Sequence, residues 1–223
     1  FEFRLDDARI DQTDFETRGL EITNTTSFGQ SAVDGIRLTY GVELYGDEQS
    51  GTRNDADRPQ FPDADVDYRA AFVQAEIPLG DTVSLIPGVR YDEFEYGSDG
   101  SFADRDDDRT SPRVAIGWSP NEDLYLWAEY AEAFRAPSLT ELYADGVHFV
   151  VPLGPGQVVI NEFVPTPDLQ AEQADQVQAG VRWRRDDLFG SGLDFEVDVT
   201  AWQSEVDNFV DQFVQFIAGE PTF

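Results

Sequence analysis

The sequence contains one histidine, His148, and its neighbours determine what chemistry it could do. Tyr143 lies five residues before it, and Phe149 and a short apolar run that ends at Leu153 follow it directly. A neutral imidazole nitrogen can bind the iron of a porphyrin, and apolar groups can cover the porphyrin ring. A tyrosine phenolate can also hold such an iron. His148 and Tyr143 are therefore candidate ligands for haem iron, although a lone histidine in a loop is more often incidental.

Two acidic stretches could bind a divalent cation. One covers residues 104–109, and the other covers residues 54–57 and continues to Asp63, Asp65 and Asp67. Their carboxylate oxygens are ligands that Ca²⁺ accepts. Neither stretch has the central glycine and terminal glutamate of an EF-hand, so solvated loop tips are the alternative interpretation.

Signatures of catalysis are missing from the sequence. It has no GxSxG elbow, no glycine loop that could cradle a phosphate, and no second histidine for a zinc site. It has no cysteine, which excludes disulfide scaffolds and thiolate zinc sites. We therefore expect a protein that is not an enzyme.

The amino-acid composition limits which partners the protein could bind and which class of protein it could be. The 223 residues carry a formal net charge of −30, and all 15 basic residues are arginines. Such a field repels phosphate backbones, which argues against nucleic-acid binding. The hydrophobic fraction of 40% is too high for a disordered acidic tail. The absence of methionine and the alternating run at the first residues suggest an internal fragment of a longer chain.

Apolar and polar residues alternate along most of the sequence, without a fault from Leu193 to Ala201. A strand with this pattern places its apolar side chains on one face and Asp194, Glu196 and Asp198 on the other, whereas a helix would scatter the carboxylates. Similar segments occupy residues 36–44, 71–79, 83–92, 113–118 and 176–183. We expect about nine strands, many close to the ~9–11 residues that cross a bilayer.

The connections between these segments alternate in length. Short ones are expected at residues 80–81, 119–123 and 185–192, and long ones at 47–66, 97–108 and 136–173. Short periplasmic turns and long extracellular loops produce this pattern in a transmembrane barrel, and aromatic residues toward the strand ends are typical of its interfacial girdles. No run approaches the ~20 apolar residues of a spanning helix. An antiparallel, all-β transmembrane barrel is therefore favoured over a soluble β-sandwich.

Two boxes flank the histidine and resemble a known family. The first, Phe134-Arg135-Ala136-Pro137, matches the FRAP box of TonB-dependent haem and haemoglobin receptors of the outer membrane. The second, Thr166-Pro167-Asp168-Leu169 followed by Glu172, is similar to their NPNL box. The family usually has asparagine where this sequence has Thr166 and Asp168, but both residues can hydrogen-bond to the backbone in turns. The resemblance covers essentially the whole chain in strand order.

The resemblance implies a bacterial outer-membrane receptor that imports haem, free or taken from a haemoprotein. Residues 1–223 would form part of a 22-stranded barrel domain, and a plug domain that contacts TonB would precede residue 1. The resemblance also implies that His148 is one ligand of the haem iron, with a second histidine in the plug. A receptor of the same family for a siderophore, vitamin or glycan, with His148 incidental, is one alternative. A passive porin-like barrel is the other.

Overall fold

The computed structural model describes residues 2–4, 9–29, 35–99, 102–190 and 192–212, and within them ten strands form one sheet. Their order is β1-β2-β3-β5-β6-β7-β8-β11-β12, with β4 paired to β3. The strands are β1 (Glu2–Arg4), β2 (Arg9–Phe28), β3 (Ile36–Arg53), β4 (Ala56–Asp57), β5 (Ala64–Pro78), β6 (Val83–Ser98), β7 (Arg105–Asn121), β8 (Leu124–Arg135), β11 (Glu172–Arg185) and β12 (Phe195–Asp207). The remaining elements are α1 (Leu139–Tyr143), a hairpin of β9 (Gly146–Gly154) and β10 (Gln157–Phe163), and the short 3₁₀ helix η1 (Leu188–Gly190).

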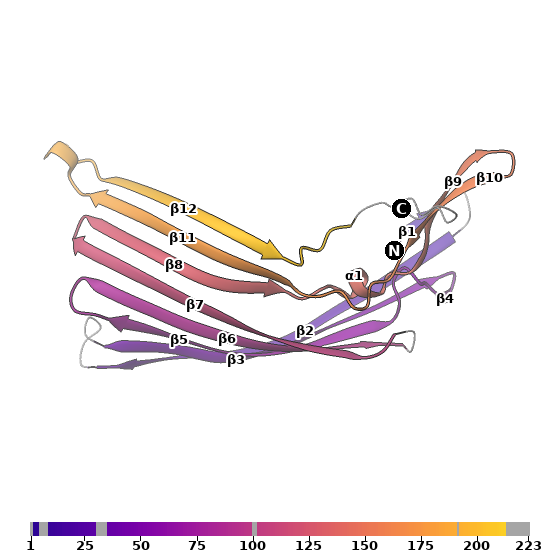
Figure 1. Cartoon of the computed structure of the whole chain (residues 1–223), viewed down its shortest axis with the longest axis horizontal. Coiled ribbons are helices and arrows are strands. Elements are labelled where there is room, and N and C mark those ends of the chain that lie inside the picture. Colours follow the sequence, from indigo (N-terminus) through magenta and orange to yellow (C-terminus); the bar gives the residue numbers. More distant parts are fainter. Residues whose placement is uncertain (1, 5–8, 30–34, 100–101, 191, 213–223) are drawn as a thin grey trace.

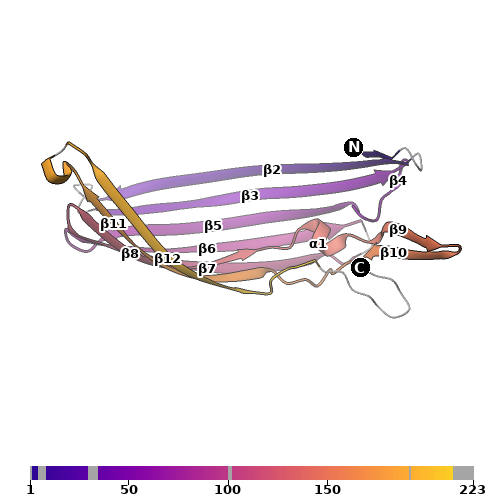
Figure 2. The ribbon, with the colours of Figure 1, turned by 90° about the horizontal axis from the view of Figure 1, so that it is seen from above.

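All pairs in the sheet are antiparallel, which confirms the expected fold class. The sheet is long and curved, and the β9–β10 hairpin projects from one of its ends (Figures 1 and 2). Among the described residues, eight strands have 12 to 20 residues, long enough to cross a bilayer. No helix in the described part of the chain is long and apolar enough to span a membrane.

One strand begins later than its alternation predicts. β12 starts at Phe195, so the expectation that Leu193 and Asp194 belong to the strand is wrong. Both residues complete the preceding turn instead. The carbonyl of Leu193 accepts a hydrogen bond from the amide of Leu188 at 2.8 Å, and the side chain of Asp194 accepts one from the amide of Asp187 at 3.3 Å. Local turn bonds override the alternation at this end.

The two faces of the sheet differ as the alternation predicts. One face, which we call the belt face, presents large apolar side chains that are at least one-third exposed. They include Val42, Val73, Val89, Val114, Ile116, Val177 and Val199. The opposite face, the inner face, carries charged residues that pair with one another. Arg90, for example, contacts Glu43 at 2.7 Å, and Arg182 contacts Asp198 at 2.8 Å. An apolar outer belt around a polar interior is the arrangement of a transmembrane barrel.

Short and long connections lie at opposite ends of the sheet. The turns β5–β6, β7–β8 and β11–β12 lie at one end, and α1, β4 and the hairpin lie at the other (Figure 1). The strands extend further into the long connections than expected, since β3 continues to Arg53 and β5 already begins at Ala64. Polar residues continue the ladder there, as in the pair Glu48 and Asp65. These extensions therefore project beyond the apolar belt and support the long connections.

Candidate functional site

The connection between β8 and β11 returns to the place where it leaves the sheet. Arg135, the last residue of β8, pairs with Glu172, the first residue of β11. Between them the chain forms α1 and the β9–β10 hairpin. We call the whole segment from 136 to 171 the hairpin loop. Because both of its ends lie in one strand pair, the sheet supplies a rigid base for it.

A cluster of charged groups closes the root of the hairpin loop. Arg135 donates to the carboxylate of Glu141 at 2.8 Å and to that of Glu172 at 2.8 Å, and we call these three residues the loop anchor. Burial raises the pKa of Glu141, but hydrogen bonds from Arg135 and Ser138 outweigh it and hold this pKa below its usual range. The Arg135 guanidinium, followed by the amide of Val210, lowers the pKa of Glu172. Both carboxylates are therefore held in their charged form.

Helix α1 begins at the same cluster. Ser138 is its N-cap, and its backbone amide donates to the Glu141 carboxylate at 2.8 Å while its hydroxyl accepts from the Glu141 amide at 3.3 Å. This reciprocal capping box satisfies two backbone donors that a helix start leaves free. Glu141 therefore joins the helix cap to Arg135, and the five-residue helix is held against the end of β8.

A small hydrophobic core lies beneath α1. It joins Leu139, Leu142 and Tyr143 of the helix with residues of β5 and β6 and with Ala171, the last residue of the loop. The sheet contributes Ala64, Val66, Phe94 and Tyr96. Because Leu142 is 0% exposed, this contact holds α1 on the inner face of the sheet.

The first family box lies at this core. The ring of Phe134 stacks on that of Phe94 with centroids 5.8 Å apart, and Ala136 packs against the same cluster. The carbonyl of Pro137 accepts a hydrogen bond from the hydroxyl of Tyr96 at 2.8 Å. The box therefore secures the outgoing end of the hairpin loop.

The second family box secures the returning end. Arg105 of β7 donates to the carbonyls of Pro167 at 3.1 Å and Leu169 at 2.6 Å. The hydroxyl of Thr166 donates to the carbonyl of Glu141 at 2.8 Å, so threonine in place of the family's usual asparagine still bonds to the backbone. Leu169 packs against the core, whereas Asp168 is exposed. The contact of Arg105 with this box could not be predicted from the sequence, because Arg105 lies 62 residues from Pro167.

His148 lies on the hairpin and is exposed. The hairpin register pairs Asn161 with Phe149 and Glu162 with Val147, so His148 is the extra residue of a β-bulge. Its Nδ1 lies 2.9 Å from Oδ1 of Asn161. Its ring is flanked by those of Phe149 and Phe163, with centroid distances of 5.0 and 4.6 Å. An exposed imidazole between aromatic rings can accept a flat, apolar ligand that carries a metal.

The base of the hairpin rests on the connection between β3 and β5. Gln60 is only 6% exposed, and its Nε2 donates to the carbonyl of Val147 at 2.5 Å. The amide of Asp145 donates to the carbonyl of Pro59 at 3.0 Å. Gly146 adopts a left-handed φ of 81°, a conformation that favours glycine, directly above Pro59. Neither Gln60 nor Asn161 carried a signal in the sequence.

The structure separates the two candidate iron ligands by environment. Tyr143 is 1% exposed and stacks on Phe102 with centroids 5.1 Å apart. Burial raises the pKa of its phenol, which disfavours the phenolate that an iron ligand requires. His148 is exposed on the hairpin, beyond this core. Of the two candidates, only His148 is accessible to a ligand in this structure, whereas Tyr143 packs in the core.

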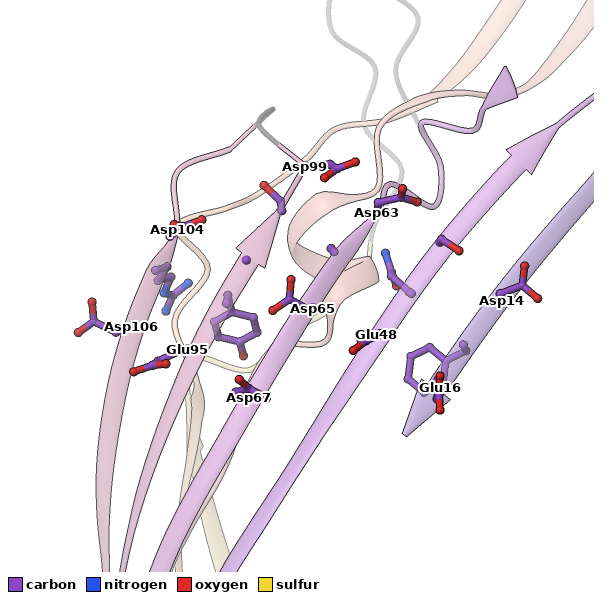
Figure 3. Close-up of a pocket in the computed structure, with 18 of the residues that line it drawn as sticks. Asp14, Glu16, Glu48, Asp63, Asp65, Asp67, Glu95, Asp99, Asp104 and Asp106 are labelled. Carbon is purple, nitrogen blue, oxygen red and sulfur yellow. The ribbon is translucent and has the colours of Figure 1, made fainter. Parts of the chain in front are cut away.

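The acidic residues of the loops form a wide, open hollow rather than a ligand cage. Carboxylates of β2, β3, β5, β6 and β7 line it, among them Glu48, Asp65, Asp67, Glu95 and Asp106 (Figure 3). Asp63 and Asp104 lie at its edge, close to the strand ends. In the described part of the chain, no group of three or more acidic, histidine or cysteine residues is placed to hold a metal ion. The suggestion of a Ca²⁺ site therefore gains no support.

Comparisons with known proteins agree with this architecture. Residues 3–221 match the family model described as "TonB dependent receptor-like, beta-barrel". The chain is 35% identical over 196 residues to the "Hemin receptor" of Yersinia pestis, and 32% identical over 206 residues to the "Heme/hemopexin utilization protein C" of Haemophilus influenzae (strain 86-028NP). These matches cover 87% and 90% of the chain but only 28% of each relative.

A solved structure shares the fold. The hemophore receptor HasR of Serratia marcescens, in complex with its hemophore HasA and heme, superposes with a TM-score of 0.75 at 22% identity. The superposition covers 89% of this chain and 34% of that one. The chain thus corresponds to about a quarter to a third of the proteins it matches.

Proposed function

This chain belongs to the family of TonB-dependent receptors, whose β-barrels lie in the bacterial outer membrane, and we propose that the receptor it helps to form binds haem at the outer surface and imports it. Two observations support the proposal. Of the curated relatives named above, one is a hemin receptor and the other a heme/hemopexin utilization protein by name. The single observation that carries it, however, is the exposed His148 on a hairpin whose aromatic neighbours suit a porphyrin.

In this proposal, the β9–β10 hairpin captures the cargo. His148 supplies one axial bond to the haem iron, and the rings of Phe149 and Phe163 lie beside the porphyrin. Exposed valines, 38–50% accessible, add apolar area on the two faces of the hairpin: Val147, Val150 and Val151. Burying such side chains against a porphyrin removes apolar area from water and adds to the affinity.

The rest of the hairpin loop holds the hairpin in place. The loop anchor and the core under α1 connect it to two strand pairs of the wall, β8–β11 and β5–β6, and the contact of Gln60 with Val147 connects it to the segment between β3 and β5. Preorganisation of this kind raises affinity because less ordering is needed when the ligand binds. The family boxes act here as supports of the site and not as its ligands.

Transport itself would depend on parts outside this chain. A plug domain filling the barrel would supply the second axial ligand and contact TonB, and movement of the plug would pass haem to the periplasm. No bond of the cargo is broken in this sequence of steps. Haem bound to a host or carrier protein would meet the same hairpin, because the hairpin projects furthest from the sheet (Figure 2).

A titration of hemin into the purified full-length receptor in detergent tests the proposal. We expect a saturable Soret band with a stoichiometry of one haem per receptor, and no competition from a ferric siderophore. Saturable binding of the siderophore without a haem signal would make this a receptor for another cargo. Absence of both, together with ion conductance in planar bilayers, would indicate a passive pore.

A further inference from the structure

His148 occupies a special place in the hairpin ladder. As the extra residue of the β-bulge, it is skipped in the backbone register of the two strands, whereas Val147 and Phe149 on either side of it are paired. A bulge turns the side chain of its extra residue away from the regular alternation, and bulges are frequent next to functional sites. The bulge therefore determines the direction in which the imidazole leaves the strand.

Asn161 contacts the imidazole from the opposite strand. Asn161 is 6% exposed, although the histidine that it contacts is exposed. Oδ1 of Asn161 lies 2.9 Å from Nδ1 of His148, which is a normal hydrogen-bond distance. With Oδ1 of Asn161 as the contacting atom, an oxygen that only accepts hydrogen bonds, the contact is one in which Nδ1 carries the proton and donates it. In a neutral imidazole this leaves the lone pair on Nε2.

The two aromatic neighbours restrict the ring further. Phe163 lies two residues after Asn161 on the same strand, and its ring centroid is 4.6 Å from that of His148 at an interplanar angle of 37°. Phe149 approaches to 5.0 Å at an angle of 59°. Rotation of the imidazole would break the bond to Asn161 and displace it from both rings. The side chain is therefore held in one orientation before any ligand arrives.

We infer that Asn161 is a positioning residue of the haem site, which holds His148 in the Nδ1-protonated tautomer and directs Nε2 toward the iron of the incoming haem. This inference rests on the proposed function and names a residue that acts through the ligand without touching the iron. Metal-bound histidines almost always donate their other ring N–H to a second group, which fixes the tautomer and raises the basicity of the ligand. Asn161 is placed to be that group.

Substitutions at Asn161 test the inference in the full-length receptor. In Asn161→Leu, a side chain of similar size without an acceptor, we expect haem affinity to fall about 10- to 100-fold, the range usual for such partners. Asn161→Asp keeps the acceptor and makes it stronger. We expect this variant to retain affinity and to lower the midpoint potential of the bound haem, because a more basic imidazole favours Fe(III). Glu162→Gln, the next residue on the strand, is the control and should leave both quantities unchanged.

A readout without haem completes the test. In ¹⁵N NMR spectra of the unloaded receptor, the signal of His148 is identified by its loss in His148→Ala. We expect the Nδ1-protonated form in the wild type and a mixture of both tautomers in Asn161→Leu. A predominantly Nε2-protonated His148 in the wild type would overturn the inference.

The outcomes separate this inference from the proposed function. If His148→Ala binds haem as the wild type does, the proposed ligand is wrong and the inference falls with it. If His148→Ala loses haem while Asn161→Leu keeps wild-type affinity, potential and tautomer, the ligand stands and the role of Asn161 is refuted. If Asn161→Leu fails to fold, Asn161→Asp still decides, since an unchanged midpoint potential there contradicts the inference.

Discussion

Replacing Arg135 by glutamine should loosen the root of the hairpin loop without disturbing the barrel. The substitution removes the bonds of the guanidinium to Glu141 and Glu172, both at 2.8 Å. A hydrogen bond to a charged group contributes about 1.5–3 kcal/mol when it is shielded, and an exposed ion pair about 0–1 kcal/mol. The Arg135 side chain is 44% exposed, while those of Glu141 and Glu172 are 31% and 14% exposed.

The two ion pairs therefore lie between these limits. We estimate that their loss lowers the local stability of the loop root by about 1–2 kcal/mol, which corresponds to a roughly 5- to 30-fold larger open population. Glu141 keeps its bonds to Ser138, and Glu172 keeps its bond to the amide of Val210, so the loss should remain local. The ladder between β8 and β11 is independent of this side chain.

Hydrogen exchange measures this population directly. The amides of Leu142, Ala144 and Thr166 make backbone bonds at the loop root, and in Arg135→Gln they should exchange about 5- to 30-fold faster. The control is Arg69→Gln, which breaks an exposed pair with Glu95 whose side chains are 52% and 48% exposed. It should change exchange at these amides by less than twofold. Equal exchange in Arg135→Gln and the wild type would refute the role of the loop anchor.

Three further predictions concern the wall, the topology and the pH dependence. Val199→Arg should hinder assembly, since an arginine on the lipid face costs about 2–4 kcal/mol at the midplane, whereas Thr200→Arg on the inner face of the same strand should assemble. The yield of folded barrel is measured by heat-modifiable mobility in gels, and similar yields for the two variants would contradict the assignment of the faces. Cysteine in place of Gln157 at the hairpin tip should react with an impermeant reagent on intact cells, while cysteine in place of Asp81 should not, and the reverse pattern would invert the orientation. Because the pKa of both glutamates of the loop anchor is lowered, the stability that they contribute is present above the ordinary glutamate pKa of about 4.3 and is lost as the pH falls through the lowered pKa. Hydrogen exchange at the loop root should therefore accelerate, beyond its intrinsic pH dependence, only on acidification below pH ~4. Constant protection down to pH ~3 would contradict this expectation.

The fold could be predicted from the sequence because its signal is local. Alternation over a strand such as β11 specifies both faces at once, and a slip of one residue would turn every apolar side chain inward. The length of the connections then indicated which end carries the loops. The error at Leu193 and Asp194 arose where alternation continues into a turn, and there hydrogen bonds to η1 and its flank decided the strand boundary.

The site could be predicted only in part. His148 could be singled out as a candidate because it is the one histidine and because two family boxes flank it. Its partner Asn161 was not, since the contact depends on a register shift that no local pattern announces. Gln60 and Val147 are 87 residues apart in sequence, and they meet only because their two connections fold over the same end of the sheet (Figure 1). Tyr143 was proposed by proximity in sequence, but the helix buries it in the core beside Phe102.

The axial ligand of the haem is the central claim, and the spectrum of His148→Ala tests it most directly. The full-length variant and the wild type are loaded with hemin in detergent and compared by absorbance and by electron paramagnetic resonance. We expect a shifted Soret band, a change of spin state and weaker binding in His148→Ala, with normal receptor levels in the outer membrane because a loop side chain contributes little to the strand ladder. Tyr143→Phe is the matched control and should keep the wild-type spectrum. Unchanged spectra and affinity in His148→Ala would contradict His148 as the axial ligand. A loss of haem binding and of the wild-type spectrum in Tyr143→Phe alone would contradict it as well.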